Sequence, residues 1–251
     1  MKKYIFITGH GRSGTSFLTD LLSGHEDIYA GHEYIGNREF WLLSWYLGGD
    51  YNQEYLKRVM HHIESTITEK TFIDVNGRLQ NCVPDLYTVF EPATVLHLVR
   101  DPRKVVRSLY IRRNDANVHL IPKARNEIGN WLDNDKFYQV CWNWARTTKQ
   151  LYDLGIPLIH FEKIITDFDY CKQSVLDVAG IQMNKEQWLK ISSQKVNRTM
   201  PRWYRYIYAR LRGKTFVEDQ LPEFKNWTNQ QKSVFFEVCG PVMELVGYSA
   251  D

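Results

Sequence analysis

The stretch YIFITGHGRSGTSFLTDLL, residues 4–22, joins a short apolar run to a glycine-rich turn and a helical segment. The turn fits the Walker A pattern Gly-x-x-x-x-Gly-Lys-[Ser/Thr] at Gly9, Gly14 and Ser16. However, Thr15 replaces the lysine, and the cation Arg12 lies inside the loop. A strand, turn and helix in this order direct backbone N–H groups and the positive helix end at an anion. The sequence therefore predicts a phosphate-binding loop whose cation is not the one that triphosphate-binding loops use.

Four short apolar runs, at residues 4–8, 71–75, 94–99 and 156–161, are separated by helical patterns. This alternation is typical of a parallel sheet that helices cover on both faces. We therefore expect a three-layer α/β fold of the P-loop NTPase-like type, in which helices flank a central, mostly parallel sheet.

Two helices are defined most clearly. Apolar residues recur with helical spacing over residues 137–154, and Gly155 follows as a helix-terminating residue. A C-terminal helix is expected from Thr228, because Gln231 completes a capping box, and Gly247 ends it. We expect this second helix to dock on the sheet.

The 251 residues carry a formal net charge of +3, are 43% hydrophobic and 24% charged, and contain no Pro/Gly/Ser-rich linker. This composition favours one globular domain, residues 1–251, and the small charge does not indicate nucleic acid. No apolar run reaches the roughly 18 residues of a membrane span, and the first apolar run is too short for an export signal. We expect a cytoplasmic protein with no membrane or nucleic-acid partner; its oligomeric state is left open.

The chain has four cysteines, Cys82, Cys141, Cys171 and Cys239. They are far apart and form no C-x-x-C pair, which favours free core thiols over disulfides or a zinc site. His61 and His62 are adjacent rather than four residues apart, which disfavours a metal site there. No metal is expected.

A second motif, TVLHLVRDPRKVVRSLYIRR, covers residues 94–113. A buried-type strand delivers Arg100 to its carboxyl end, Pro102 begins a helix, and Ser108 lies eight residues after Arg100. An arginine and a hydroxyl so placed could clamp a second phosphate. The alternative is that Arg100 pairs with Asp101 at the strand end.

Together, the Arg12–Ser16 loop and the Arg100–Ser108 motif resemble the sulfotransferases that use 3′-phosphoadenosine 5′-phosphosulfate (PAPS) and release 3′-phosphoadenosine 5′-phosphate (PAP). The segment IPLIHFEKIITD (156–167) and the last helical segment are also similar to that family. The resemblance implies that Arg12, Ser13, Gly14, Thr15 and Ser16 bind the 5′-phosphosulfate. It implies that Arg100 and Ser108 bind the 3′-phosphate, and that Phe161 contacts the adenine.

Arg12 would then stabilise the sulfuryl group during transfer to a hydroxyl or amine of a small-molecule acceptor. In-line transfer of this kind depends on positioned cations and N–H donors, without an obligatory magnesium ion. The candidate base is Glu33 in IYAGHEYIGN, because tyrosylprotein sulfotransferases resemble this chain in placing a glutamate at the same spacing. His32 is its competitor, and His10 lines the loop. A solvated loop carboxylate is the alternative interpretation of Glu33.

The chain departs from the family at three points. Where many relatives have Asp-Lys-x-Pro, this chain has Asp74-Val75-Asn76-Gly77, so that Arg78 becomes the candidate substitute for the lysine. Phe161 replaces a usual tyrosine. The Arg-Lys-Gly-x-x-Gly signature is absent, and other cations become candidates for the extra anion contacts: Lys214, Lys225, Arg107, Arg112 and Arg113.

Two further segments have open interpretations. RWYRYIYARLRGK (202–214) is rich in cations and aromatic rings, which fits a lid, an acceptor contact or single-stranded nucleic acid. REFWLLSWYLGG (38–49) supplies aromatic side chains to an acceptor pocket or to the core. Two rival functions remain, an ATP-dependent small-molecule kinase with a degenerate loop and a non-catalytic nucleotide- or RNA-binding module.

Overall fold

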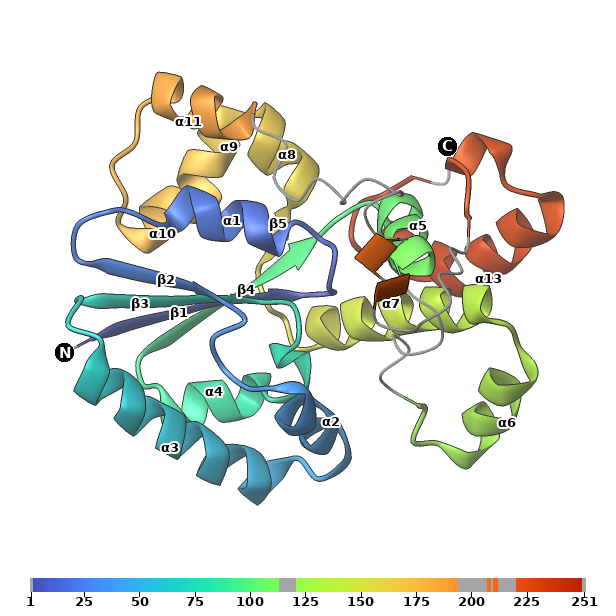
Figure 1. The fold of residues 1–251 in the computed structure, drawn as a ribbon, viewed down its shortest axis with the longest axis horizontal. Coiled ribbons are helices and arrows are strands. Elements are labelled where there is room, and N and C mark those ends of the chain that lie inside the picture. The colour runs from blue at the N-terminus through green and yellow to red at the C-terminus, as the bar shows by residue number, and fades with distance from the viewer. Residues whose placement is uncertain (1, 113–120, 194–206, 209, 212–219, 250–251) are drawn as a thin grey trace.

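A computed structural model describes residues 2–112, 121–193, 207–208, 210–211 and 220–249. Its central element is one five-stranded sheet in which every strand pairs in parallel, in the order β2-β3-β1-β4-β5 (Figure 1). The strands are β1 (Lys3–Gly9), β2 (Ile28–His32), β3 (Thr71–Asn76), β4 (Ala93–Val99) and β5 (Leu158–His160). The expected α/β fold is confirmed, with a sheet that is entirely parallel rather than mostly so.

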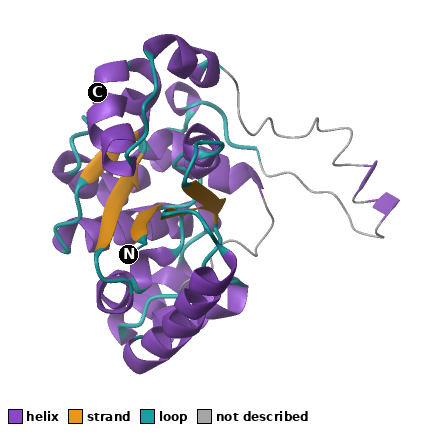
Figure 2. Ribbon diagram, turned by 90° about the vertical axis from the view of Figure 1, so that its left-hand side faces the viewer, coloured by secondary structure: helices purple, strands orange, loops and turns teal. Residues whose placement is uncertain are grey.

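Helices lie on both sides of the strands, as Figure 2 shows. The α-helices are α1 (Thr15–Leu22), α2 (Arg38–Tyr46), α3 (Gly49–Thr66), α4 (Val83–Val89), α5 (Pro102–Arg112), α6 (Arg125–Asp133), α7 (Lys136–Asp153), α8 (Phe161–Thr166), α9 (Phe168–Cys171), α10 (Asp177–Ala179), α11 (Lys185–Ser192) and α13 (Asn229–Leu245). Three short turns of other helical types are η1 (Leu79–Asn81), η2 (Lys172–Leu176) and η3 (Phe224–Asn226).

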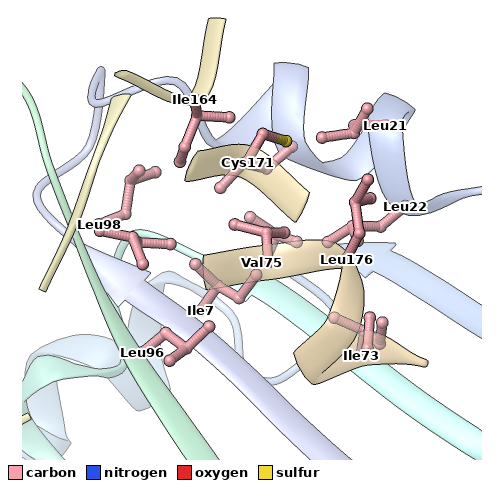
Figure 3. Packing of buried hydrophobic residues seen from close by; sticks show 14 of the residues in the cluster. Ile7, Leu21, Leu22, Ile73, Val75, Leu96, Leu98, Ile164, Cys171 and Leu176 are labelled. Carbon is pink, nitrogen blue, oxygen red and sulfur yellow. The ribbon is translucent and has the colours of Figure 1, made fainter. Parts of the chain in front are cut away.

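The alternation of side chains along β1 divides the core between the two faces of the sheet. Ile5 and Ile7 pack with α1 and with the α8–α11 segment, in the cluster that Figure 3 shows. Tyr4 and Phe6 point to the other face and pack with α2, α3 and α4. A third cluster joins α5, α7 and α13 beside β4. The inner strands β1, β3 and β4 are therefore buried on both faces, as parallel strands normally are.

All four expected strands exist, but the sequence did not predict the edge strand β2, which pairs only with β3. Its sequence IYAGH has no continuous apolar run, because this edge strand is less completely buried than the inner strands: only Ile28 and Gly31 are fully buried, and His32 is exposed. The last predicted strand, residues 156–161, was too long by three residues, since β5 covers only Leu158–His160. Phe161 begins α8 instead of ending β5.

Both predicted helices exist, with bounds that differ from the prediction by only one or two residues. α7 ends at Asp153, and Gly155 adopts a positive φ of 68° just beyond it. Thr228 and Gln231 form the expected capping box at the start of α13. The expected docking on the sheet is wrong in its main partner, because α13 packs mainly along α7.

The end of the α13 segment still reaches the sheet, where a ring nitrogen of His160 lies 2.8 Å from the Val246 carbonyl. The four cysteines are free and buried, as expected. Among the described helices, none combines the length and the apolar character needed to cross a membrane.

Candidate functional site

The glycine-rich loop connects β1 to the first turn of α1. Gly14 is the residue before the helix and has a φ of 106°, which an L side chain rarely adopts. It offers no capping side chain to the first-turn N–H groups, so these donors are available to an anionic ligand. A Cβ at Gly14 would also lie 2.2 Å from two ring carbons of Phe161. The position therefore requires glycine both for its backbone conformation and for its contact with Phe161.

Arg12 connects this loop to the second motif. Its Nε donates to Oγ of Ser108 on α5 at 2.9 Å, and its carbonyl accepts a bond from Arg100 at 3.2 Å. Arg100 directly follows β4, which is the neighbour of β1 in the sheet. The chain leaves β1 toward β3 and β2 but leaves β4 toward β5, so this point is a topological switch, where open α/β sheets bind ligands. The two sequence motifs therefore meet at one site.

Arg100 is half-buried beneath the loop. Its guanidinium lies 4.6 Å from the centre of the Phe161 ring, and its Nε is buried without a hydrogen-bond partner. Burial lowers the pKa of Arg100, although the nearby Glu162 carboxylate acts in the opposite direction. The alternative pairing of Arg100 with Asp101 is not observed, because Asp101 pairs with Arg103 at 3.0 Å. A cation with an unpartnered donor fits an anionic ligand.

Glu33 and His32 lie at the carboxyl end of β2. Glu33 has a φ of 52°, and its N–H donates to the Val75 carbonyl at 3.2 Å. Three non-glycine residues among those described have a positive φ, and they include both Arg12 and Glu33. A strained backbone persists only where its surroundings hold it, and such positions gather at functional sites.

His32 faces the glycine-rich loop. Its Nε2 lies 3.0 Å from Oγ1 of Thr15 and 3.4 Å from Oγ of Ser16. The histidine therefore touches the two hydroxyls at the start of α1. The sequence did not predict this contact. From the sequence, His32 was only the alternative to Glu33 as the general base.

The surroundings that hold Glu33 centre on the buried Asp74. Its two carboxylate oxygens accept from the N–H groups of Tyr34 and Ile35, both at 2.9 Å, and Asn76 donates to it at 3.0 Å. Burial raises the pKa of Asp74 to about 6, although these three bonds favour the carboxylate. In the sequence, Asp74 was considered only as part of a family motif. Its burial could have been predicted, because it is a carboxylate within the apolar run TFIDV.

Arg78 lies beside Glu33, with its Nε 3.7 Å from a Glu33 carboxylate oxygen and its guanidinium 4.3 Å from the centre of a Trp41 ring. The preceding Gly77 packs closely against the glycine-rich loop, since a Cβ there would be 3.2 Å from backbone atoms of Gly11. The segment after β3 thus brings the candidate substitute for the family's lysine to the candidate base.

The other candidates lie less centrally. The buried Ser13 hydroxyl has no hydrogen-bond partner, and a ring nitrogen of His10 lies 2.9 Å from the Gly11 carbonyl. Arg107 donates to the Leu221 carbonyl, and Lys225 pairs with a surface glutamate at 3.4 Å. Lys214, Arg113 and most of segment 202–214 lie outside the described residues, as does the Arg112 side chain. Within the described part of the chain, no cluster of three or more His, Cys, Asp or Glu side chains could hold a metal ion.

Solved structures of sulfotransferases resemble this chain. The sulfotransferase domain of the Synechococcus PCC 7002 olefin synthase is 14% identical, with a TM-score of 0.53, over 98% of this chain and 94% of that one. The sulfotransferase domain from the curacin biosynthetic pathway is 12% identical, with a TM-score of 0.55, over 99% of each chain. Mouse sulfotransferase SULT7A1, complexed with PAP, is 14% identical, with a TM-score of 0.50, over 99% of this chain and 90% of that one.

No family model and no curated protein matches the sequence. The likeness to the three solved structures shows that the chain has the fold of the PAPS-dependent sulfotransferases. At 12–14% identity it establishes the fold alone.

Proposed function

We propose that this protein is a sulfotransferase that transfers the sulfuryl group of PAPS to a hydroxyl or amine of a small-molecule acceptor. The observation that carries the proposal is the contact of Arg12 with both Ser108 and Arg100. It joins the loop after β1 to the motif after β4, the two segments that such a nucleotide would bridge. The likeness to a structure that holds PAP supports the same choice of nucleotide.

The residues at this point fit PAPS. The first turn of α1, uncapped by any side chain, and Arg12 suit the 5′-phosphosulfate, and we assign Ser13, Thr15 and Ser16 to the same group. Arg100 and Ser108 suit the 3′-phosphate. Phe161 is only 9% exposed, between Gly14 and Arg100, so we assign it the role of supporting these two residues rather than of stacking on adenine.

In the proposed reaction the acceptor oxygen or nitrogen attacks sulfur and forms a new bond to it. The bond between sulfur and the bridging oxygen breaks, and PAP leaves with the electron pair of that bond. Arg12 would neutralise charge on the bridging oxygen and the sulfuryl oxygens, where a preorganised cation has its largest effect. Glu33 would take the acceptor's proton. His32 touches Thr15 and Ser16, which favours a role in positioning the loop.

Calorimetry tests the nucleotide directly. The wild type should bind PAP more tightly than ADP or Mg-ATP, and Arg100→Ala should weaken PAP binding by tenfold or more, because one charge-assisted contact is worth about 1.5–3 kcal/mol. Arg58→Ala removes an exposed arginine that pairs with Glu54 within α3 and serves as the control. Preference for Mg-ATP would favour the kinase instead. Salt-dependent oligonucleotide binding without sulfuryl transfer would favour the binding module.

A further inference from the structure

Helix α2 presents two tryptophans, Trp41 and Trp45, four residues apart and therefore on one face. A cationic side chain lies over each of the two rings. The Arg78 guanidinium lies 4.3 Å from the centre of the Trp41 ring, and the Arg146 guanidinium of α7 lies 4.0 Å from the centre of the Trp45 ring. The exposed Lys123 ammonium also lies 4.5 Å from the Trp45 ring. The face of α2 thus combines apolar rings with three positive charges.

Arg146 is a largely buried cation without a carboxylate partner in the described part of the chain. One terminal nitrogen donates to Gln150 at 3.0 Å and the other to Thr147 at 3.4 Å, while Nε is buried without a partner. Burial lowers the pKa of Arg146 to about 10, although the Glu127 carboxylate acts in the opposite direction. Buried charges are normally paired, because desolvation is costly. The Arg146 guanidinium has no such anionic partner among the described residues.

The same cation is linked to the candidate base. Gln150, which accepts from Arg146, donates to the Gln80 carbonyl at 3.0 Å. Gln80 lies two residues after Arg78, and Arg78 lies beside Glu33. A chain of contacts thus leads from Arg146 on α7 to the segment that carries Arg78, the neighbour of Glu33.

Other polar atoms near this link also lack partners. The side-chain oxygens of Gln80 and Asn81 are buried without a hydrogen bond. An acceptor pocket built for an apolar molecule would not leave such atoms unsatisfied. These amide oxygens need hydrogen-bond donors, which a polar acceptor supplies, and the unpaired Arg146 guanidinium indicates that the acceptor also carries a negative charge.

We propose that Arg146, assisted by Lys123, binds an anionic group of the acceptor, so that the substrate is an alcohol, phenol or amine that also carries a carboxylate or another oxyanion. This inference rests on the proposed function. Trp45 would pack against the apolar part of the acceptor, and the reacting hydroxyl or amine would point to Glu33. Arg146 is then a specificity-determining residue.

Matched acceptor pairs test the proposal. The probes are 4-hydroxyphenylacetate with 4-hydroxyphenylacetamide, and 6-hydroxyhexanoate with its amide. The wild type should prefer the anionic member of a pair by about tenfold or more in kcat/KM, as expected for a charge-assisted contact. Arg146→Gln should reduce this ratio to about one, whereas Arg146→Lys should retain part of it. PAP affinity, measured by calorimetry, should change less than twofold in both variants.

Binding of phenylacetate and phenylacetamide to the PAP-bound protein gives a second measurement that needs no turnover. Phenylacetate should bind the wild type more tightly, and Arg146→Gln should abolish the difference. Equal binding, no binding of either compound, or a preference that survives Arg146→Gln would overturn the proposal. So would a variant that loses PAP affinity without a change in the ratio. Failure of the proposed function is distinct from these results, because the wild type would then not bind PAP.

Discussion

Arg12 and Ser108 are 96 positions apart in the sequence, yet the Nε of Arg12 donates to the Ser108 hydroxyl at 2.9 Å. This bond fixes the side chain of an arginine whose backbone has a positive φ of 77°. Because Ser108 lies on α5, the orientation of Arg12 depends on how that helix packs beside β4. The second motif therefore determines the orientation of the Arg12 side chain, the cation of the glycine-rich loop.

Ser108→Ala removes this acceptor. PAP binding should weaken roughly tenfold, because a hydrogen bond to a charged group is worth about 1.5–3 kcal/mol. Ser65→Ala, which removes an exposed hydroxyl on α3 that bonds only to the His62 carbonyl, should leave binding unchanged. Calorimetric titration with PAP measures both variants, and equal affinities for them would contradict the assignment of Ser108.

Gly14→Ala should be strongly destabilising. The new Cβ would combine about 1–2 kcal/mol of left-handed backbone strain with a 2.2 Å approach to the Phe161 ring. Gly24→Ala is the matched control, since Gly24 has a φ of 78° but no atom within 4 Å of its added Cβ. Urea unfolding should show a larger loss of stability for Gly14→Ala than for Gly24→Ala.

A double variant that removes the Phe161 ring tests whether the contact with this ring causes the loss of stability in Gly14→Ala. The double variant Gly14→Ala/Phe161→Ala should lose less stability than the sum of the two single losses, because Phe161→Ala removes the ring atoms that the new methyl group meets. Strictly additive losses in the double variant would show that the contact with Phe161 is not the cause.

Glu33→Gln should lower kcat by about 100-fold or more, the usual minimum for a lost general base, with PAP affinity unchanged. Glu39→Gln, an exposed change in the first turn of α2, is the control. His32→Gln decides between the two candidates: we expect it to weaken PAP binding, since His32 touches Thr15 and Ser16. A larger loss of kcat in His32→Gln than in Glu33→Gln would transfer the role of base to His32.

Two buried groups should give opposite pH dependences of stability. Burial raises the pKa of Asp74 from 3.8 to about 6, so the folded protein keeps a proton that the unfolded chain releases, and the free energy of unfolding falls as pH rises through this window. Burial lowers the pKa of His97 from 6.5 to about 3. The unfolded chain then binds the extra proton, and the free energy of unfolding rises with pH between these values.

The two effects overlap between pH 4 and 6 and partly cancel there. Asp74→Asn should therefore make stability rise more steeply with pH than in the wild type, by roughly 3 kcal/mol across the window, from about 1.4 kcal/mol per unit of pKa shift. His97→Gln should change the slope in the opposite direction. Urea unfolding at pH 4.5 and 6 measures both, and parallel profiles for the wild type and the two variants would contradict the assignment.

The sequence by itself determined the features that depend on neighbouring residues. A strand, a glycine turn and a helix start lie within residues 4–22, so the anion-binding geometry of Gly14 follows from local chemistry. The capping box at Thr228 is local in the same sense. Apolar runs that alternate with helical patterns were likewise enough to predict a parallel sheet, whose inner strands are buried on both faces.

Tertiary structure decided the contacts that join distant segments. The edge strand β2 exists because β3 offers it an edge, and Asp74 holds Tyr34 and Ile35 from 40 and 39 positions away. The pairing of Arg146 with Trp45 likewise depends on the packing of α7 beside α2. Such contacts have no sequence signal in a single chain, because the buried side chains that meet are chosen by how whole elements pack rather than by their neighbours in the sequence.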